Sequence, residues 1–344
     1  MFLRKSSGEA GEYSSVAIGD SKRCGSTLVL TDPTVLENLK YMAVGSSLFS
    51  QVSFGIKNDG SVVSWNEVSG QVYYYATDDT LPTSKSPTLI PRACSSGVKK
   101  IVNCTEYDSN GGLIALKDDG SLVIWGNGGK VPPSELSATD FIDVSMSPMG
   151  GCAIFLKTNG TAFIWDIINN QIVKAGSIKY NNFNYNNFIS TLNGYNGSVI
   201  KVAAGMNIGG NADTGTFLAL TGDGRVYSNI SRTGFETCFL DQGSVYKDVI
   251  YTNGYGLCAK RIDDYVDIFG GCYNTSPTFT TKVHNKRYAF VNPGYQEYAY
   301  ANKIYGYCID DGKFYLGLDE WKCDSTEVKG IYTDFFNGYI YAIY

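Results

Sequence analysis

The sequence predicts an all-β fold, a seven-bladed β-propeller that forms one domain over residues 1–344. Three observations predict it. A short hairpin phrase recurs six times, an additional strand precedes each copy, and the two ends of the chain resemble the halves of a seventh copy. Of the 344 residues, 43% are hydrophobic, so the chain can bury a sizeable core. Seven units then take on the order of 50 residues each, which is the size of a propeller blade.

The repeated phrase is an apolar strand, a tight turn and a second strand that ends in an aromatic residue. Its clearest copies are Phe54–Trp65, Ile114–Trp125 and Ile154–Trp165. Weaker copies follow at Leu218–Asn229, Cys258–Phe269 and Gly306–Gly317. The turn positions are Gly60, Gly120, Gly160, Gly224, Asp264 and Gly312. Asn-Gly and Asp-Gly between alternating apolar residues favour a hairpin, because these residues accept the positive φ of the turn.

The columns of the repeat are apolar on both sides of the turn, with Lys260 as the exception. The residues two places after it are Val62, Leu122, Ala162, Val226, Val266 and Phe314. The residues four places before it are Ile56, Leu116, Leu156, Leu220, Lys260 and Cys308. Regular apolar positions at a spacing of two predict strands with a buried face.

A further strand precedes each hairpin, and there is one such strand more than there are hairpins. The seven segments are Tyr41–Gly45, Lys100–Cys104, Phe141–Ser145, Ile200–Gly205, Asp248–Tyr251, Tyr288–Asn292 and Gly330–Thr333. We therefore expect the seventh hairpin to be split between the termini, with blade seven shared by about 14–20 and 328–344. Joining the ends would close the ring and remove its open edge. The clearest helix signal is short, with Asp32 as N-cap, Pro33 at the first position and Thr34–Lys40 behind it.

The phrase Ala115–Gly126, which reads ALKDDGSLVIWG, resembles the repeat of the regulator-of-chromosome-condensation propellers. The resemblance extends over nearly the whole chain at the level of the repeat and is strongest in the first three copies. After Trp125-Gly126 the chain continues with Asn-Gly-Gly-Lys instead of the family's Gly-Gln-Leu-Gly-like run. The acidic residues and the β-wedge that serve nucleotide exchange in that family have no counterpart that can be placed on this sequence. The resemblance thus implies a fold and not an activity.

Two insertions between the repeats are the candidate binding segments, because propellers bind partners through their loops. They are Gln71–Pro91 and Gln171–Asn196, and both are rich in aromatic and amide side chains that suit protein or carbohydrate recognition. The candidate binding residues are Tyr73, Tyr74, Tyr75, Tyr180, Phe183, Tyr185, Phe188 and Tyr195. The alternative is that these rings pack on the rim of the propeller or between its blades.

Catalytic and metal chemistry are disfavoured. The chain contains one histidine, His284, and lacks a nucleophile elbow and a P-loop. Its nine cysteines form no Cys-x-x-Cys pair, which argues against zinc. We therefore predict no enzyme activity, no cofactor and no metal. Most cysteines are expected to be reduced packing residues, and some disulfides remain an alternative.

Three classes of function are open. The leading one is a structural or adhesive propeller of a virion, a bacteriophage tail or capsid-associated protein that mediates assembly or host attachment. Its partners would be neighbouring virion subunits or a host-surface receptor, which includes a glycan. The second class is an intracellular protein-interaction propeller of the chromosome-condensation type, and the third is a lectin-like or inhibitor propeller.

The choice among these classes depends on charge and on the chain's ends. Only 18% of residues are charged, the loops are rich in Tyr, Asn and Gly, and the start carries no apolar signal segment. We expect synthesis in the cytoplasm without a signal peptide, and then a virion or otherwise a cytoplasmic location. The net charge of −5 argues against nucleic acid, and no apolar run is long enough to insert in a membrane.

Overall fold

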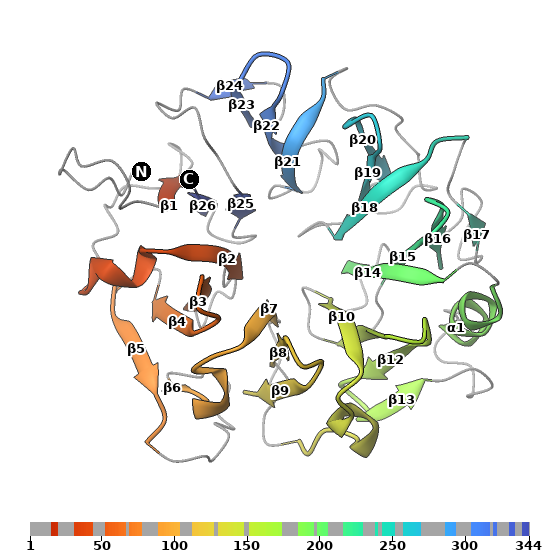
Figure 1. The fold of residues 1–344 in the computed structure, drawn as a ribbon, viewed down its shortest axis with the longest axis horizontal. Coiled ribbons are helices and arrows are strands. Elements are labelled where there is room, and N and C mark those ends of the chain that lie inside the picture. The colour runs from red at the N-terminus through yellow and green to blue at the C-terminus, as the bar shows by residue number, and fades with distance from the viewer. Residues whose placement is uncertain are drawn as a thin grey trace. The chain divides into compact units, whose positions relative to one another are not determined.

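The computed structural model of the chain describes these residues: 15–19, 31–43, 52–66, 69–77, 89–103, 112–126, 130–147, 151–173, 185–195, 198–205, 216–229, 238–239, 243–251, 257–269, 286–293, 304–316, 319–321, 330–333 and 339–343. They belong to two compact units, which are described separately (Figure 1). The first unit is Met1–Val131 with Lys322–Tyr344, and the second is Pro132–Trp321.

The first unit contains three sheets. Its strands are β1 (Ser15–Gly19), β2 (Leu39–Ala43), β3 (Val52–Lys57), β4 (Val62–Asn66), β5 (Val72–Tyr75), β6 (Leu89–Ile90), β7 (Val98–Asn103), β8 (Leu113–Lys117), β9 (Leu122–Trp125), β25 (Gly330–Thr333) and β26 (Tyr339–Ile343). The sheet orders are β1-β26-β25, β2-β3-β4-β5-β6 and β7-β8-β9. All pairs are antiparallel except β5 and β6, which run parallel.

Within its described residues, the second unit contains four antiparallel sheets and one α-helix. Its elements are β10 (Phe141–Met146), β11 (Cys152–Lys157), β12 (Ala162–Asp166), β13 (Gln171–Val173), α1 (Tyr185–Gly194), β14 (Val199–Gly205), β15 (Thr216–Thr221), β16 (Val226–Ser228), β17 (Cys238–Phe239), β18 (Tyr246–Tyr251), β19 (Leu257–Arg261), β20 (Val266–Phe269), β21 (Tyr288–Pro293), β22 (Ile304–Cys308), β23 (Phe314–Leu316) and β24 (Asp319–Trp321). The sheet orders are β10-β11-β12-β13, β14-β15-β16-β17, β18-β19-β20 and β21-β22-β23-β24. An all-β chain of small sheets, three to five strands each, is thus confirmed.

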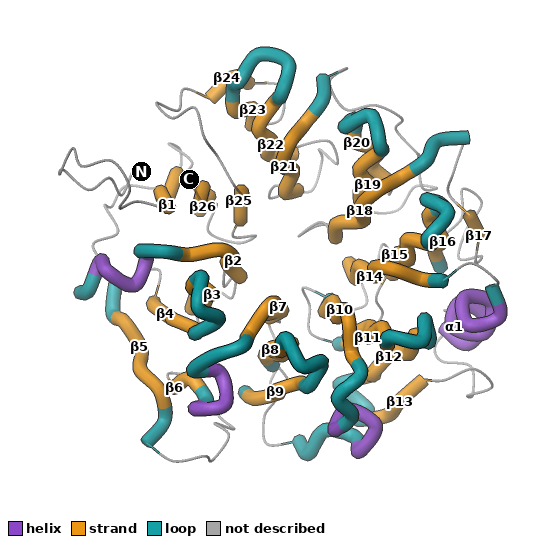
Figure 2. The backbone as a smooth tube through the Cα atoms, viewed as in Figure 1, coloured by secondary structure: helices purple, strands orange, loops and turns teal. Residues whose placement is uncertain are grey.

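All six predicted hairpins are present, and Figure 2 shows their turns as loops between paired strands. Each predicted turn residue has the left-handed conformation that the sequence requires. The φ angles are 81° at Gly60, 80° at Gly120, 80° at Gly160, 81° at Gly224, 69° at Asp264 and 66° at Gly312. A side-chain oxygen completes several turns. For example, a carboxylate oxygen of Asp119 accepts the Ser121 N–H at 2.9 Å and the Ser121 hydroxyl at 2.6 Å.

The seven predicted leading strands are present as β2, β7, β10, β14, β18, β21 and β25. Six of them carry a β-bulge near the start, where one extra residue interrupts the register. The extra residues are Lys40, Lys99, Ile142, Ile200, Lys247 and Ala289. These bulge positions are equivalent from one sheet to the next.

The short helix signal is confirmed only in its first turn. Pro33–Leu36 form a 3-10 helix, and an Asp32 carboxylate oxygen accepts the Thr34 N–H at 3.0 Å. The helix ends before the predicted Lys40, because Asn38 takes a positive φ of 59° and Leu39 begins β2.

Both faces of a sheet are buried, and alternation along the strand assigns each side chain to one neighbouring sheet. In β15, Phe217 and Ala219 join the core that contains β11 and β12 residues, whereas Leu218 and Leu220 join the core that contains Val249 and Ala259. The same alternation appears in the first unit, where residues of β3 and β8 share one core. Period-two strands buried on both faces explain why the repeat columns are apolar on both sides of the turn.

The two ends of the chain meet in one sheet of the first unit. Strand β1 pairs antiparallel with β26, from Ser15 opposite Ile343 to Gly19 opposite Tyr339. Strand β26 also pairs with β25. The N-terminal strand is therefore hydrogen-bonded to the C-terminal hairpin.

Candidate functional site

Of the three predicted tyrosines in the first insertion, two pack against the core and one is exposed to solvent. They lie in β5, with Tyr73 and Tyr75 packed partly buried against the core of this unit. The Tyr75 hydroxyl donates to the Val62 carbonyl at 2.6 Å and accepts the Val62 N–H at 3.0 Å. Tyr74 points the other way and is 67% exposed, opposite Leu89 in the pairing of β5 with β6. Only Tyr74 of the three offers its ring to a partner.

In the second insertion, Phe188 corrects the sequence-based hypothesis. It lies in α1 and is fully buried, and its ring stacks on Tyr227 and Phe217 with centroids 5.6 Å and 6.1 Å away. Phe188 is a core residue, because the helix presents it to the sheet β14–β17. Tyr180 and Phe183 lie outside the described residues, and so does the side chain of Tyr185.

Tyr195 follows α1 and contacts a hairpin turn. Its hydroxyl donates to an Asp223 carboxylate oxygen at 2.7 Å. This hydrogen bond raises the pKa of Tyr195. The pKa of Asp223 is lowered by hydrogen bonds from the hydroxyls of Thr221 and Tyr195. Asp223 is the middle residue of the Gly222–Gly224 turn, so the predicted site residue Tyr195 lies beside this turn.

Two aliphatic side chains, Ile200 and Val245, flank this turn, and Ile262 is hydrogen-bonded to Val245. We call these three residues, together with the turn Gly222–Gly224, the turn patch. A Cβ added to Gly222 would lie 3.8 Å from Ile200 Cγ2, and one added to Gly224 would lie 2.3 Å from Val245 Cγ1. Ile200 and Val245 therefore flank the turn from its two sides. The Ile262 N–H donates to the Val245 carbonyl at 3.0 Å, which places Ile262 next in the row.

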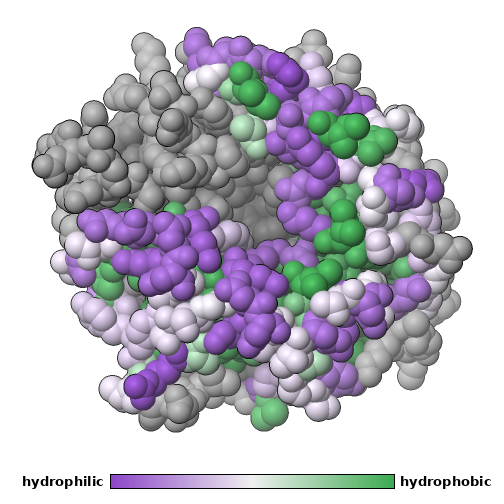
Figure 3. All heavy atoms as spheres, viewed as in Figure 1, coloured by the Kyte–Doolittle hydropathy of each residue, from purple (hydrophilic) through white to green (hydrophobic). Residues whose placement is uncertain are grey.

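The side chains of the turn patch are unusually open to solvent for aliphatic residues. Ile200 is 49% exposed, Val245 46% and Ile262 60%. Figure 3 shows apolar atoms between hydrophilic ones over the region of β14 to β20. Two further exposed aliphatic side chains of this unit, Ile142 and Ile309, occupy equivalent positions in the adjacent sheets. Exposed aliphatic side chains that gather in one region of a surface are typical of an interaction site.

The repeat provides an internal comparison, because six of the seven sheets have the same three positions. These positions are the first residue of the hairpin turn, the residue just before the leading strand, and the bulge residue. The first turn residue donates its N–H to the carbonyl of the residue before the leading strand, and the bulge residue lies two positions after that residue. In the first unit these positions are filled by Asn38, Lys40, Asn58, Gly97, Lys99 and Asp118. None of the six is a large apolar residue. The fold itself therefore does not require Ile200, Val245 or Ile262 to be apolar.

The charges beside the turn patch are paired within the unit. Lys201 forms an ion pair with Asp248, and the Lys247 and Lys260 ammonium groups both contact Asp264. Burial acts to raise the pKa of Asp264, but hydrogen bonds from the two lysines outweigh it and lower the pKa. These pairs keep the surroundings of the patch close to neutral.

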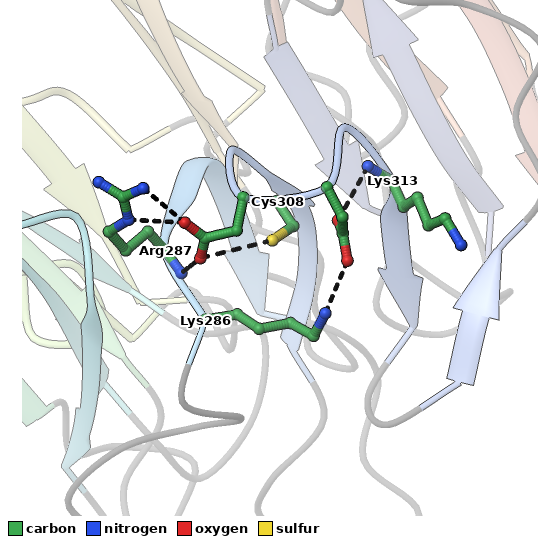
Figure 4. A network of polar contacts seen from close by, with 6 residues as sticks. Lys286, Arg287, Cys308 and Lys313 are labelled. Atoms are coloured by element: carbon green, nitrogen blue, oxygen red, sulfur yellow. Dashed lines mark hydrogen bonds and ion pairs between the residues drawn. The ribbon is translucent and has the colours of Figure 1, made fainter.

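A second cluster of charges lies at the turn between β22 and β23 (Figure 4). The Arg287 guanidinium contacts Asp310 Oδ1 through Nε at 2.7 Å and through its NH2 group at 2.6 Å, and the Arg287 N–H donates to Oδ2 at 2.9 Å. Lys286 pairs with Asp311 at 2.7 Å. The Arg287 backbone and side chain lower the pKa of Asp310. The cluster joins the start of β21 to the turn between β22 and β23 of the same sheet, since β21 begins at the residue after Arg287.

The turn carboxylates give a pH prediction. The pKa values of Asp119, Asp223, Asp264 and Asp310 are all lowered in the folded chain. A carboxylate whose pKa is lower in the folded than in the unfolded chain stabilises the folded state. This contribution is fully present above the pKa of the unfolded chain, about 3.9, and is lost as the pH falls through the pKa of the folded chain. We expect the melting temperature to be flat from neutral pH to about pH 5 and to fall below about pH 4. Thermal melts followed by circular dichroism across this pH range measure the decline in melting temperature. In the variant Asp119→Asn this decline is expected to be smaller, because one of the carboxylates is gone. A melting temperature that rises on acidification would contradict the assignment.

Four cysteines are buried and free, namely Cys94, Cys152, Cys258 and Cys308. Burial raises the pKa of the Cys94 thiol to about 12 and also raises those of Cys258 and Cys308. The predicted packing role is confirmed at these four positions. Among the described residues, no group of three or more His, Cys, Asp or Glu is placed to hold a metal ion. Within the same ranges, no helix is long and apolar enough to cross a membrane.

The aliphatic residues of the turn patch were not among the predicted binding residues. The signal that could have found Ile262 is its column, which holds Asn58, Asp118 and Thr158 in the first three copies of the repeat. Ile200 is the first residue of a predicted strand, Val245 lies three residues before one, and neither carries such a signal. Ile200 joins the patch through a contact with the turn of its own sheet, and Val245 through a contact with the turn of the neighbouring sheet.

No protein-family model matches the chain, and no curated protein matches it by sequence. Among solved structures, the chain is similar to the β-propeller domain of Cps50 (Swd1) from Myceliophteria thermophila. The identity is 11% and the TM-score 0.49, over 89% of this chain and 98% of that one. A similarity at this level assigns neither a fold nor a function to the chain.

Proposed function

We propose that the chain is a non-enzymatic protein-binding module that contacts its partner through the turn patch. The observation that carries the proposal is the exposure of Ile200, Val245 and Ile262 in one row, at positions that are polar or glycine in the equivalent sheets of the first unit. Burying such side chains releases free energy of about 25 cal/mol per Å² of apolar surface. The free chain lacks this stabilisation while the three side chains are exposed, and a partner that buries them would gain it as binding free energy.

The chemistry of the patch favours a protein over a sugar or a nucleic acid. Its centre is aliphatic and the lysines beside it are paired with carboxylates, so few cationic groups are available to bind phosphates. One aromatic ring, that of Tyr195, lies at its edge through the bond to Asp223. Aliphatic centres bordered by tyrosine and satisfied charges are typical of protein interfaces.

Site-specific photo-crosslinking tests the proposal. A photo-reactive residue at Ile262 is expected to give adducts with one or a few proteins in cells of the source. The matched control is Asn58, which holds the equivalent turn position in the first unit. Adducts that form from position 58 as readily as from position 262, or from neither, would count against the proposed surface.

We further propose that the seven sheets are the blades of one propeller, closed by the sheet β1-β26-β25. The regular hairpins, the bulged leading strands and the pairing of β1 with β26 support this proposal. Removing residues 1–20 deletes β1 and leaves β26 without one of its two partners. We expect the truncated chain to lose the cooperative thermal transition of the full chain, as measured by calorimetry. An unchanged melting curve would contradict closure by the termini.

The location of the module in a virion stays a prediction from composition. Low charge and Tyr-, Asn- and Gly-rich loops motivate it, and a surface that binds protein is compatible with assembly into a particle. Mass spectrometry of purified virus particles tests it through the copy number of the chain per particle. Recovery only in the soluble cell lysate would favour the alternative of an intracellular interaction propeller.

A further inference from the structure

We propose that Asn159 is a self-modification site, at which the turn between β11 and β12 deamidates and gains a carboxylate. Asn159 is exposed in this turn and precedes Gly160. The Gly160 nitrogen attacks Cγ of Asn159 and closes a five-membered succinimide ring. The bond from Cγ to the side-chain nitrogen breaks, and that nitrogen leaves as ammonia with the proton of the attacking N–H. Water then opens the ring at either carbonyl and gives aspartate or isoaspartate.

The local structure leaves the reacting groups accessible. Asn159 Oδ1 accepts the Thr161 N–H at 2.9 Å, which polarises the amide carbonyl toward attack at Cγ. Among the described residues, the Asn159 side-chain nitrogen has no hydrogen-bond partner. The Gly160 N–H donates to the Lys157 carbonyl at 2.9 Å, and the attack requires this bond to open. A hydrogen bond in an exposed turn opens at a lower cost than one in the core.

The product fits the turn, because the repeat has an acidic residue there in every other copy. The Asp119 carboxylate accepts both the N–H and the hydroxyl of Ser121. Thr161 offers the same two donors at the equivalent position, so an aspartate at position 159 would complete the same turn. The residues that hold the column of Asn159 in the other copies are Asp59, Asp119, Asp223, Asp263 and Asp311.

A second Asn-Gly pair, Asn193-Gly194, provides an internal comparison. Asn193 is also exposed, but it lies in α1 and both ends of its amide are held. Its Oδ1 accepts the Ala162 N–H at 2.8 Å, and its Nδ2 donates to the Ala162 carbonyl at 3.0 Å. The leaving nitrogen is therefore restrained, and a carboxylate in its place would face that carbonyl without a proton to donate. We expect Asn193 to resist the reaction.

Peptide mapping by mass spectrometry tests the inference on the full chain, held at mildly alkaline pH either folded or in denaturant. In denaturant the two sites are expected to react at similar rates, because they share the same dipeptide. In the folded chain Asn159 is expected to react at least about tenfold faster than Asn193, because the reaction at Asn193 must also break its two side-chain hydrogen bonds. Both aspartate and isoaspartate are expected at position 159.

Two variants serve as controls. Asn159→Gln keeps the amide but lengthens the side chain, so the five-membered ring cannot form and conversion at position 159 is expected to be lost. Asn159→Asp is expected to elute from an ion-exchange column with the aged unmodified chain, since both carry the added charge. Thermal melts establish that both variants are folded.

Three results would overturn the inference. The first is a folded chain in which Asn159 stays intact while the denatured chain converts. The second is equal conversion of Asn159 and Asn193 in the folded chain. The third is aspartate at position 159 without isoaspartate, because direct hydrolysis of the amide would then replace the route through the ring.

Discussion

Phe188→Ala is expected to lower the free energy of unfolding by about 3–5 kcal/mol. The Phe188 side chain is fully buried, and its ring stacks on those of Phe217 and Tyr227. Removing the ring loses the transfer free energy of its atoms and leaves a cavity between α1 and the sheet β14–β17. Chemical denaturation followed by circular dichroism and by fluorescence measures the loss.

Tyr74→Ala is the matched control, because both residues are aromatic and both lie in segments that the sequence analysis proposed for binding. Tyr74 is 67% exposed, so its replacement is expected to change stability by no more than about 0.5 kcal/mol. Equal effects of the two substitutions would mean that α1 does not pack on the sheet as described. Phe188 would then be available again as a binding residue.

The contrast between these two residues shows where composition alone misleads. The aromatic and amide side chains of the second insertion suggested a recognition loop. Their spacing contained a further signal, because Phe188, Ile189 and Leu192 recur as one apolar stripe of a helix and are all buried. Helix α1 was not predicted, because the expectation for this segment rested on its composition and not on its period.

The hairpins could be predicted because their signals are local. An Asp-Gly or Asn-Gly turn and alternating apolar residues lie within a dozen residues of one another, and they set the same φ in every copy. The outer strands β5, β13, β17 and β24 were not predicted as strands. They contain only two to four residues and form by pairing with an existing edge, so they carry little signal of their own.

The turn patch could not be predicted as a surface for a related reason. It combines a bulge residue, a residue before a strand and two turns, and these come from sequence positions 200 to 262. Tyr195 was predicted as a site residue from its aromatic character. Its position beside the patch follows from the hydrogen bond to Asp223, which no sequence pattern indicates.

Gly60→Ala is expected to cost more stability than the same substitution at any turn glycine that has space around it. Gly60 has a φ of 81°, and an added Cβ would lie 2.6 Å from the Gly97 backbone nitrogen. The positive φ alone costs about 1–2 kcal/mol for a residue with a Cβ. Forcing backbone atoms apart adds about 1–3 kcal/mol. The displacement also strains the hydrogen bond of 3.0 Å from the Val98 N–H to the Gly60 carbonyl, which joins two successive sheets.

Gly160→Ala separates the two contributions. Gly160 has a φ of 80°, but the nearest atom to its added Cβ is the Val199 nitrogen at 3.8 Å, which is an ordinary contact. We therefore expect Gly160→Ala to show only the conformational cost, and Gly60→Ala to exceed it by at least about 1 kcal/mol in chemical denaturation. Equal losses would show that the sheets do not approach so closely at Gly60. A larger loss at Gly60 would locate a main contact between successive sheets at a turn whose glycine is required for two physical reasons, its φ and its lack of a side chain.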